Sequence, residues 1–317
     1  MKQKDIFYII NLQTIVLFLI LWYHIIDYNF IKVGIYSMSM WLFVIISGII
    51  QGLAEFLPIS SSGHLSLFQN FFGMDEIPMT FDIMLHLGTL AAVFIVYRKD
   101  IFPLVPAFFT MLGKIFKGKF KLSEATVHER FVLMVIIATI PLVLIVPFTD
   151  YIDLIGQTSW TIGCILIFNG IMLFVSDKMA SGKVNAENVK PRNALVTGLF
   201  QMCATLPGLS RSGSTITGGL TQGFNREYAV KFSFIMSIPA ILGAAVTDIP
   251  DVLEGTIDKA NLLPFIVGTL VAFVSGIAAM KLLIYISKKS NFKIFSVYCL
   301  IVGALIVVLD LCNITFA

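Results

Sequence analysis

Apolar segments long enough to cross a lipid bilayer recur along the whole chain and limit the folds open to it. A hydrocarbon core of roughly 30 Å requires about 20 such residues in a helix. Of the 317 residues, 57% are hydrophobic and 13% are charged, whereas about a quarter are charged in soluble domains. Windows of the required length span residues 6–26, 79–97, 131–149, 158–176, 228–247, 262–280 and 294–314. The sequence therefore predicts an all-α, polytopic integral membrane protein.

The N-terminal window needs separate treatment, because it follows Lys2 and Lys4 like a signal sequence. No small-residue cleavage pattern comes after it, so we expect an uncleaved helix. Residues 1–37 are then an N-terminal extension with an extra transmembrane helix, and residues 38–317 are a single membrane domain. A start at Met38 or Met40 is the alternative.

Two polar, glycine-containing motifs lie inside apolar segments and are related copies. One is Gln51-Gly-Leu-Ala-Glu55-Phe-Leu-Pro-Ile-Ser60-Ser-Ser-Gly-His64, and the other is Gln201-Met-Cys-Ala-Thr205-Leu-Pro-Gly-Leu-Ser210-Arg-Ser-Gly-Ser-Thr215. An offset of 150 relates them, since 201 − 51 = 150 for Gln and 213 − 63 = 150 for Gly. Repeat 1 is expected at about 41–149 and repeat 2 at about 193–317. Pro58 and Pro207 interrupt each motif and predict a helical hairpin.

The charges of the loops predict opposite orientations for the two hairpins. Residues 98–130 contain seven Lys or Arg, and residues 177–192 and 281–293 contain four each. These loops are expected in the cytoplasm. Counting crossings from them, the first hairpin enters and leaves on the outer side and the second on the cytoplasmic side. The expected fold has inverted-topology repeats with two re-entrant helical hairpins whose tips form a polar cavity.

Gln51 and Glu55 lie four residues apart and so share one helix face. A buried carboxylate requires a partner, and Arg211 is the cation of the second tip. We therefore expect Glu55 and Arg211 to pair across the repeats. The alternative is an ion pair that only locks the hairpins together.

The first tip also carries Ser60, Ser61, Ser62 and His64. Serine, histidine and glutamate together are typical of a nucleophile, a proton carrier and an orienting base. The alternative for His64 is a hydrogen-bonded packing residue.

The second tip places hydroxyl groups around Arg211 at the start of a helix, where free backbone N–H groups attract anions. The hydroxyls belong to Ser210, Ser212, Ser214 and Thr215, and Gly213 contributes a backbone N–H group. This composition predicts a phosphate-binding loop. Helix capping is the alternative for Ser62, Ser212 and Ser214.

Other chemistry has little support in the sequence. Asp82 and His86 lie four residues apart, but two ligands are too few for a metal site and a rim role is expected. The cysteines have no paired spacing. The charge pattern does not favour nucleic-acid binding.

Together, the two motifs closely resemble those of the bacitracin-resistance family of undecaprenyl-diphosphate phosphatases. The resemblance covers about residue 38 to the C-terminus. It implies an enzyme of the bacterial cell membrane that removes the terminal phosphate of undecaprenyl diphosphate, a polyprenyl diphosphate lipid. The product is the monophosphate carrier used in cell-wall synthesis.

The resemblance also implies site residues. Glu55, Ser61, His64 and Arg211 are the expected catalytic residues, and Gln51, Ser60, Ser210, Ser212, Gly213 and Thr215 join Arg211 in binding phosphate. Glu55 would orient His64 or hold a divalent cation, Mg²⁺ or Ca²⁺. No organic cofactor is expected. Membrane lipids are expected partners, and a homo-oligomer is compatible with the sequence.

A membrane transporter or flippase for an anionic lipid or small anion is the main alternative, because inverted repeats with broken helices also build transporters. An intramembrane serine protease is a weaker one. Ser61, His64, Glu55 and Arg211 favour the phosphatase, because transport does not require a serine beside a proton carrier.

Overall fold

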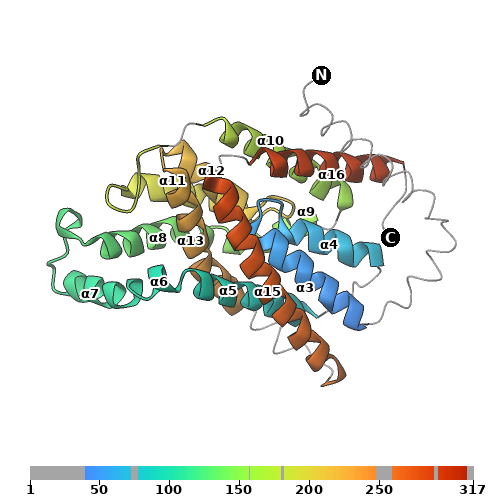
Figure 1. Ribbon diagram of the computed structural model, residues 1–317, viewed down its shortest axis with the longest axis horizontal. Coiled ribbons are helices and arrows are strands. Elements are labelled where there is room, and N and C mark those ends of the chain that lie inside the picture. Colours follow the sequence, from blue (N-terminus) through green and yellow to red (C-terminus); the bar gives the residue numbers. More distant parts are fainter. Residues whose placement is uncertain are drawn as a thin grey trace. The chain divides into compact units, whose positions relative to one another are not determined.

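A computed structural model describes residues 40–72, 78–156, 158–179, 182–247, 259–288 and 292–312 of the chain. The described residues from Val44 onward belong to one compact unit, and the described residues before it are the first turn of helix α3. The α-helices, shown in Figure 1, are α3 (Met40–Phe56), α4 (Ser61–Phe72), α5 (Met79–Val96), α6 (Arg98–Ile101), α7 (Leu104–Phe116), α8 (Val127–Val143), α9 (Thr149–Gly156), α10 (Ser159–Asp177), α11 (Pro191–Cys203), α12 (Arg211–Thr221), α13 (Arg226–Thr247), α15 (Lys259–Lys288) and α16 (Lys293–Leu311). Short 3₁₀ turns lie at Leu122–Glu124 and Val146–Phe148.

Six helices of the described residues are long and apolar enough to span a membrane. They are Met79–Val96, Val127–Phe148, Ser159–Asp177, Arg226–Thr247, Asn261–Lys288 and Lys293–Leu311. Each overlaps one window predicted from the sequence, so these six predictions are confirmed. The seventh window, residues 6–26, lies outside the described residues. The chain is a polytopic all-α membrane protein.

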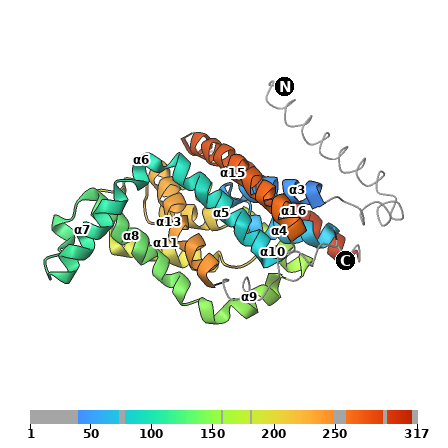
Figure 2. The same ribbon diagram turned by 90° about the horizontal axis from the view of Figure 1, so that it is seen from below.

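Small residues allow the membrane helices to pack closely. A Cβ atom on Gly163 of α10 would lie 3.0 Å from the carbonyl oxygen of Gly303 on α16, and one on Gly303 would lie 2.6 Å from that of Gly163. Backbones can approach this closely only where neither residue has a side chain. Helices α5 and α15 also lie side by side, as Figure 2 shows.

Two helical hairpins are interrupted where the prolines predict. Helix α3 ends at Phe56, two residues before Pro58, and α4 begins at Ser61. Helix α11 ends at Cys203, before Pro207, and α12 begins at Arg211. A helical proline lacks the N–H group and displaces the preceding turn, so the chain turns at each tip. Re-entry of the hairpins from opposite membrane faces stays a prediction.

The two tips contact each other in a reciprocal way. A Cβ atom on Gly63 of the first tip would lie 2.9 Å from the Cα atom of Gly208 in the second. A Cβ atom on Gly213 of the second tip would lie 3.1 Å from the Cβ atom of Pro58 in the first. The repeat offset exchanges these contacts, because 58 + 150 = 208 and 63 + 150 = 213. The tips thus meet around a local pseudo-twofold axis.

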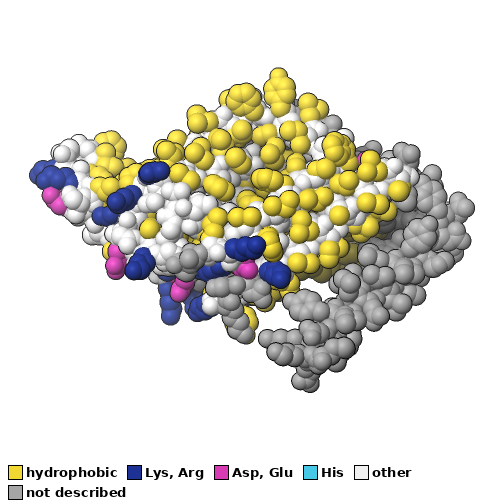
Figure 3. All heavy atoms as spheres, turned by 90° about the horizontal axis from the view of Figure 1, so that it is seen from above, with side chains coloured by type: hydrophobic (Ala, Val, Ile, Leu, Met, Phe, Trp, Pro, Cys, Tyr) yellow, Lys and Arg dark blue, Asp and Glu magenta, His cyan; other side chains and the backbone are white. Residues whose placement is uncertain are grey.

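Polar contacts join the ends of three membrane helices. Arg226 at the start of α13 pairs with Asp177 at the end of α10, and the backbone N–H of Phe292, just before α16, donates to the same carboxylate at 2.9 Å. Two of the Lys- and Arg-containing loops therefore lie together, as the predicted topology requires. Figure 3 shows one face, on which hydrophobic side chains cover much of the described surface and Lys and Arg gather toward the left of the view.

Candidate active site

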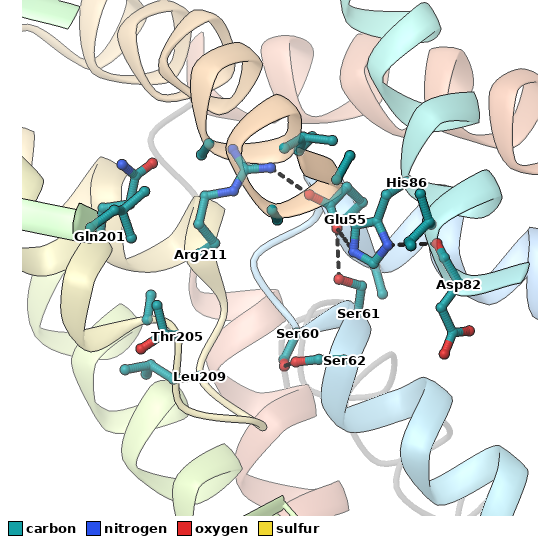
Figure 4. Close-up of a pocket in the computed structure, with 18 of the residues that line it drawn as sticks. Glu55, Ser60, Ser61, Ser62, Asp82, His86, Gln201, Thr205, Leu209 and Arg211 are labelled. Atoms are coloured by element: carbon teal, nitrogen blue, oxygen red, sulfur yellow. Dashed lines mark hydrogen bonds and ion pairs between the residues drawn. The ribbon is translucent and has the colours of Figure 1, made fainter. Parts of the chain in front are cut away.

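A cavity of about 420 Å³ lies where the two tips meet, and both contribute to its lining. Its polar lining comes from Glu55, Ser60, Ser61, Ser62, Asp82, His86, Gln201, Thr205 and Arg211, which Figure 4 shows converging from several helices. Its apolar lining includes Ile83, Leu142, Ile241, Ala244 and Ala245. The cavity thus combines a charged, hydroxyl-containing region with an apolar wall.

Glu55 is the central residue of the polar region and is 7% exposed. Arg211 Nη2 donates to its Oε1 at 2.5 Å, which confirms the predicted pairing of the two residues. Ser61 Oγ donates to Oε2 at 2.7 Å, and Gln51 Nε2 donates to the same oxygen at 3.1 Å. Three donors therefore hold the carboxylate in one orientation, and one of them is the hydroxyl of Ser61.

Ser61 and Arg211 are each the first residue of the second helix of their hairpin. They occupy equivalent positions in the repeats, because 211 − 150 = 61. The first residues of both helices therefore line one cavity, and helix N-termini favour anions. With the guanidinium of Arg211, this arrangement favours a multiply charged anion such as a phosphate.

Ser60 holds the turn before Ser61 in an unusual conformation. Its φ of 73° lies in the left-handed region that non-glycine residues seldom adopt. Its Oγ accepts a hydrogen bond from the backbone N–H of Gly63 at 3.3 Å and so caps α4. Ser60 lines the cavity, as a phosphate-binding residue should, but its side chain already serves the helix.

The other predicted phosphate-binding residues lie behind the cavity. Gln51, Ser210, Ser212, Gly213 and Thr215 are buried and are not among the residues that line it. Ser210 Oγ caps α12 through Gly213 N, and the Thr215 hydroxyl contacts that of Ser233 at 2.6 Å. Their hydroxyls thus shape the start of α12, and Arg211 is the member of this loop that reaches the cavity.

The structure does not place the predicted proton carrier, His64, in hydrogen-bond contact with Ser61. His64 Nδ1 lies 2.7 Å from the carbonyl oxygen of Ser60, and its Nε2 lies 2.8 Å from the Tyr298 hydroxyl, so both ring nitrogens are engaged away from Ser61. His64 is not among the cavity-lining residues. Its ring instead reaches Tyr298 of α16. The contacts indicate a residue that fixes the tip.

His86 is the imidazole that lines the cavity instead. Its Nε2 lies 3.9 Å from Glu55 Oε2, and the side chain is 37% exposed. Asp82 also lines the cavity, but its carboxylate accepts a hydrogen bond from Gln69 at 3.2 Å. The described residues contain no group of three or more His, Cys, Asp or Glu that could hold a metal ion. The sequence placed His86 at the rim, whereas the structure places it beside the carboxylate.

Asn169 joins the two tips and was missed in the sequence. It is fully buried in α10, donates to the carbonyl oxygen of Pro58 at 3.0 Å and accepts from the backbone N–H of Ser210 at 3.4 Å. Its only signal was an amide within an apolar span. Such a residue contacts backbone groups distant in sequence, and no local pattern identifies them.

Comparison with known proteins finds relatives over most of the chain. Residues 44–305 match the family described as bacitracin resistance protein BacA. An undecaprenyl-diphosphatase of Methanobrevibacter smithii is 43% identical over 265 residues, which are 83% of this chain and 95% of the relative. Undecaprenyl-diphosphatases of Alkaliphilus metalliredigens and Carboxydothermus hydrogenoformans are 41% and 39% identical, over 84% of this chain and 98% and 96% of theirs. This chain therefore belongs to the BacA family of bacitracin resistance proteins.

Proposed function

We propose that this chain hydrolyses undecaprenyl diphosphate to undecaprenyl phosphate and inorganic phosphate in the bacterial cell membrane, and so recycles the lipid carrier for cell-wall synthesis. The observation that carries the proposal is the hydrogen bond from Ser61 Oγ to Glu55, whose other oxygen pairs with Arg211. A hydroxyl, a carboxylate that can accept its proton and a phosphate-binding cation thus face one cavity. Family membership supports the same activity.

The proposed reaction begins with attack of Ser61 Oγ on the terminal phosphorus. Glu55 accepts the hydroxyl proton as the new O–P bond forms, because it is already the acceptor at 2.7 Å. The bond between phosphorus and the bridging oxygen breaks, and its electron pair leaves with undecaprenyl phosphate, to which Glu55 passes the proton. The restored carboxylate then takes a proton from water as the water oxygen attacks the phosphoserine. The bond between phosphorus and Ser61 Oγ breaks, Oγ takes that proton back from Glu55, and inorganic phosphate is released.

Charge stabilisation in this reaction comes from the second repeat. Phosphoryl transfer depends mainly on positioning and on neutralising the charge of the phosphate oxygens. Arg211 is 16% exposed and is oriented by its contacts with Glu55 and with the carbonyl oxygen of Ser233, 3.4 Å from Nη1. The guanidinium is therefore ordered before substrate binds, which lowers the entropic cost of holding the transition state.

The apolar wall of the cavity suits the lipid part of the substrate. Ile83, Leu142 and Ile241 line the cavity together with alanines near the end of α13. A polyprenyl chain can lie along such a surface while the diphosphate occupies the polar region. The cavity volume of about 420 Å³ suits a headgroup with the first part of its tail.

A divalent cation, Mg²⁺ or Ca²⁺, stays a prediction. Both oxygens of Glu55 already accept hydrogen bonds from Gln51, Ser61 and Arg211. The described residues also lack a cluster of three metal ligands. They do not fit a preformed metal cage, so we propose that any cation enters with the diphosphate, as Mg²⁺ commonly does with phosphate ligands.

Phosphate release from undecaprenyl diphosphate by the purified protein in detergent tests the proposed activity. We expect wild type to turn over and Arg211→Ala and Ser61→Ala to be strongly impaired. Absence of phosphate release by folded wild type would refute the proposed enzymatic activity. Full activity in Arg211→Ala would refute the phosphate-binding role, and full activity in Ser61→Ala would show that water attacks phosphorus directly.

The geometry of the cavity does not favour the transporter alternative. Moving an anion across a membrane needs no serine hydroxyl that donates to a carboxylate, whereas the contact of Ser61 with Glu55 is what a hydrolase requires. The named relatives are diphosphatases.

A further inference from the structure

Gln201 is a buried amide at the cavity for which the proposed reaction has so far no role. It is 1% exposed and lines the cavity with Arg211 and Thr205. Neither its Nε2 nor its Oε1 has a hydrogen-bond partner among the described residues. Burying an amide without partners costs free energy, so such a group in a ligand cavity points to a ligand.

Comparison of the repeats explains why this amide is unengaged. Gln201 is the equivalent of Gln51, which donates to Glu55 four residues later. The residue four after Gln201 is Thr205, whose hydroxyl donates to the carbonyl oxygen of Met202. The first repeat uses its amide to orient the carboxylate, whereas the second repeat keeps the amide but lacks the carboxylate.

The position of Gln201 indicates which part of the substrate it meets. In Figure 4, Arg211 lies between Gln201 and Ser61. In-line displacement places the leaving group on the side of the phosphorus opposite the nucleophile. With the terminal phosphate between Ser61 and Arg211, the lipid-linked phosphate extends away from Ser61 and toward Gln201.

We propose that Gln201 binds the lipid-linked phosphate of the diphosphate, with its Nε2–H donating to an oxygen of that phosphate. This inference rests on the proposed diphosphatase activity. As the bond to the bridging oxygen breaks, negative charge develops on the departing lipid phosphate, and the amide hydrogen bond strengthens. Gln201 is then a substrate-binding residue that recognises the leaving group, while Arg211 binds the group that is transferred.

Gln201→Met tests this role, since methionine has a similar length but cannot donate to phosphate. We expect kcat/KM for undecaprenyl diphosphate to fall at least about 10-fold, as when a hydrogen bond to a charged group is lost. Inhibition by undecaprenyl phosphate should weaken by a similar factor, because that product carries the recognised phosphate. Inhibition by inorganic phosphate should stay within about twofold of wild type, because that product is the transferred group.

Thr217→Val is the matched control. The Thr217 hydroxyl is also buried without a partner among the described residues, but the residue does not line the cavity. This variant should keep the kcat/KM of wild type. Thermal unfolding of both variants should match or exceed wild type, because each loses a buried polar group.

Several results would overturn the assignment. Unchanged kcat/KM in Gln201→Met would refute the proposed contact with the lipid-linked phosphate. Equal weakening of inhibition by both products would indicate that Gln201 binds the transferred phosphate instead. A lower unfolding temperature with a proportionate loss of activity would indicate a structural role. If Gln201→Met does not fold, Gln201→Glu should lose at least about 10-fold in kcat/KM relative to wild type, because a carboxylate repels phosphate and cannot donate to it. Wild-type turnover by Gln201→Glu would refute the proposal. Inactive wild type would instead refute the proposed function itself.

Discussion

Replacing Arg211 by methionine tests separately how the ion pair with Glu55 contributes to stability and how Arg211 contributes to activity. The substitution leaves a carboxylate that is 7% exposed without its cation. Removing one partner of a buried pair costs about 3–5 kcal/mol. We expect about 3 kcal/mol, because Gln51 and Ser61 continue to donate to Glu55. At about 2–4 °C per kcal/mol for a chain of this size, the apparent unfolding temperature should fall by about 6–12 °C.

Activity should fall much more than stability. An arginine that neutralises the charge of a transferred phosphoryl group contributes about 10³–10⁵ to kcat, so Arg211→Met should lose at least about 10³-fold. The double variant Glu55→Gln/Arg211→Met removes both charges and should recover most of the unfolding temperature while remaining inactive.

Tryptophan fluorescence of the protein in detergent measures unfolding, and phosphate release measures turnover. Arg226→Met is the matched control, because it breaks another buried ion pair, with Asp177, outside the cavity. It should lower the unfolding temperature and leave kcat/KM of the folded fraction unchanged. Equal stability of Arg211→Met and the double variant would refute the argument that Glu55 depends on this cation.

Four further predictions concern the tip, His86 and the cation. Because Ser60 has a positive φ, stability should decrease in the order Ser60→Gly, Ser60→Ala, Ser60→Val, as followed by thermal unfolding; the reverse order would contradict backbone strain at this turn. His64→Phe should lower the unfolding temperature and kcat without changing the shape of the pH–rate profile, because both ring nitrogens hold the tip; a lost limb of the profile would restore His64 as a proton carrier. His86→Gln should lower kcat less than about tenfold, since Nε2 lies 3.9 Å from Glu55, whereas inactivation would make His86 essential. Finally, calorimetry should detect Mg²⁺ binding after chelation only when a diphosphate is present, and tight binding to the substrate-free protein would contradict entry of the cation with substrate.

The sequence was sufficient to predict the membrane helices, because crossing a membrane imposes a local requirement on the length and polarity of a segment. The spans from Met79 onward follow from the lengths of the apolar segments, and the breaks near Pro58 and Pro207 follow from the positions of the prolines. The pairing of Glu55 with Arg211 was predictable for a different reason, since a buried carboxylate needs a cation and the second tip supplied one.

The orientation of individual side chains was not predictable from the motifs. His64 lies within the first motif, yet its ring nitrogens contact Ser60 and Tyr298, and His86 from another helix lies beside the carboxylate. Ser210 and Thr215 carry hydroxyls suited to phosphate, but local hydrogen bonds engage them in shaping α12. Gln201 could have been identified, because comparison with Gln51 shows an amide that has lost its carboxylate. The residue types indicated the chemistry of the site, whereas the packing of the helices and tips determined which side chains line the cavity.

The equivalence of Ser61 and Arg211 bears on how such a site can arise. Two identical units related by a twofold axis would place the same side chain at both positions. Two serines would leave the phosphate without a cation, and two arginines would leave it without a nucleophile. A self-assembling pair of single repeats could therefore bind an anion but could not combine these two roles at one phosphorus atom. Joining both copies in one chain allows each position to change alone, and the division of labour between nucleophile and cation depends on that covalent link.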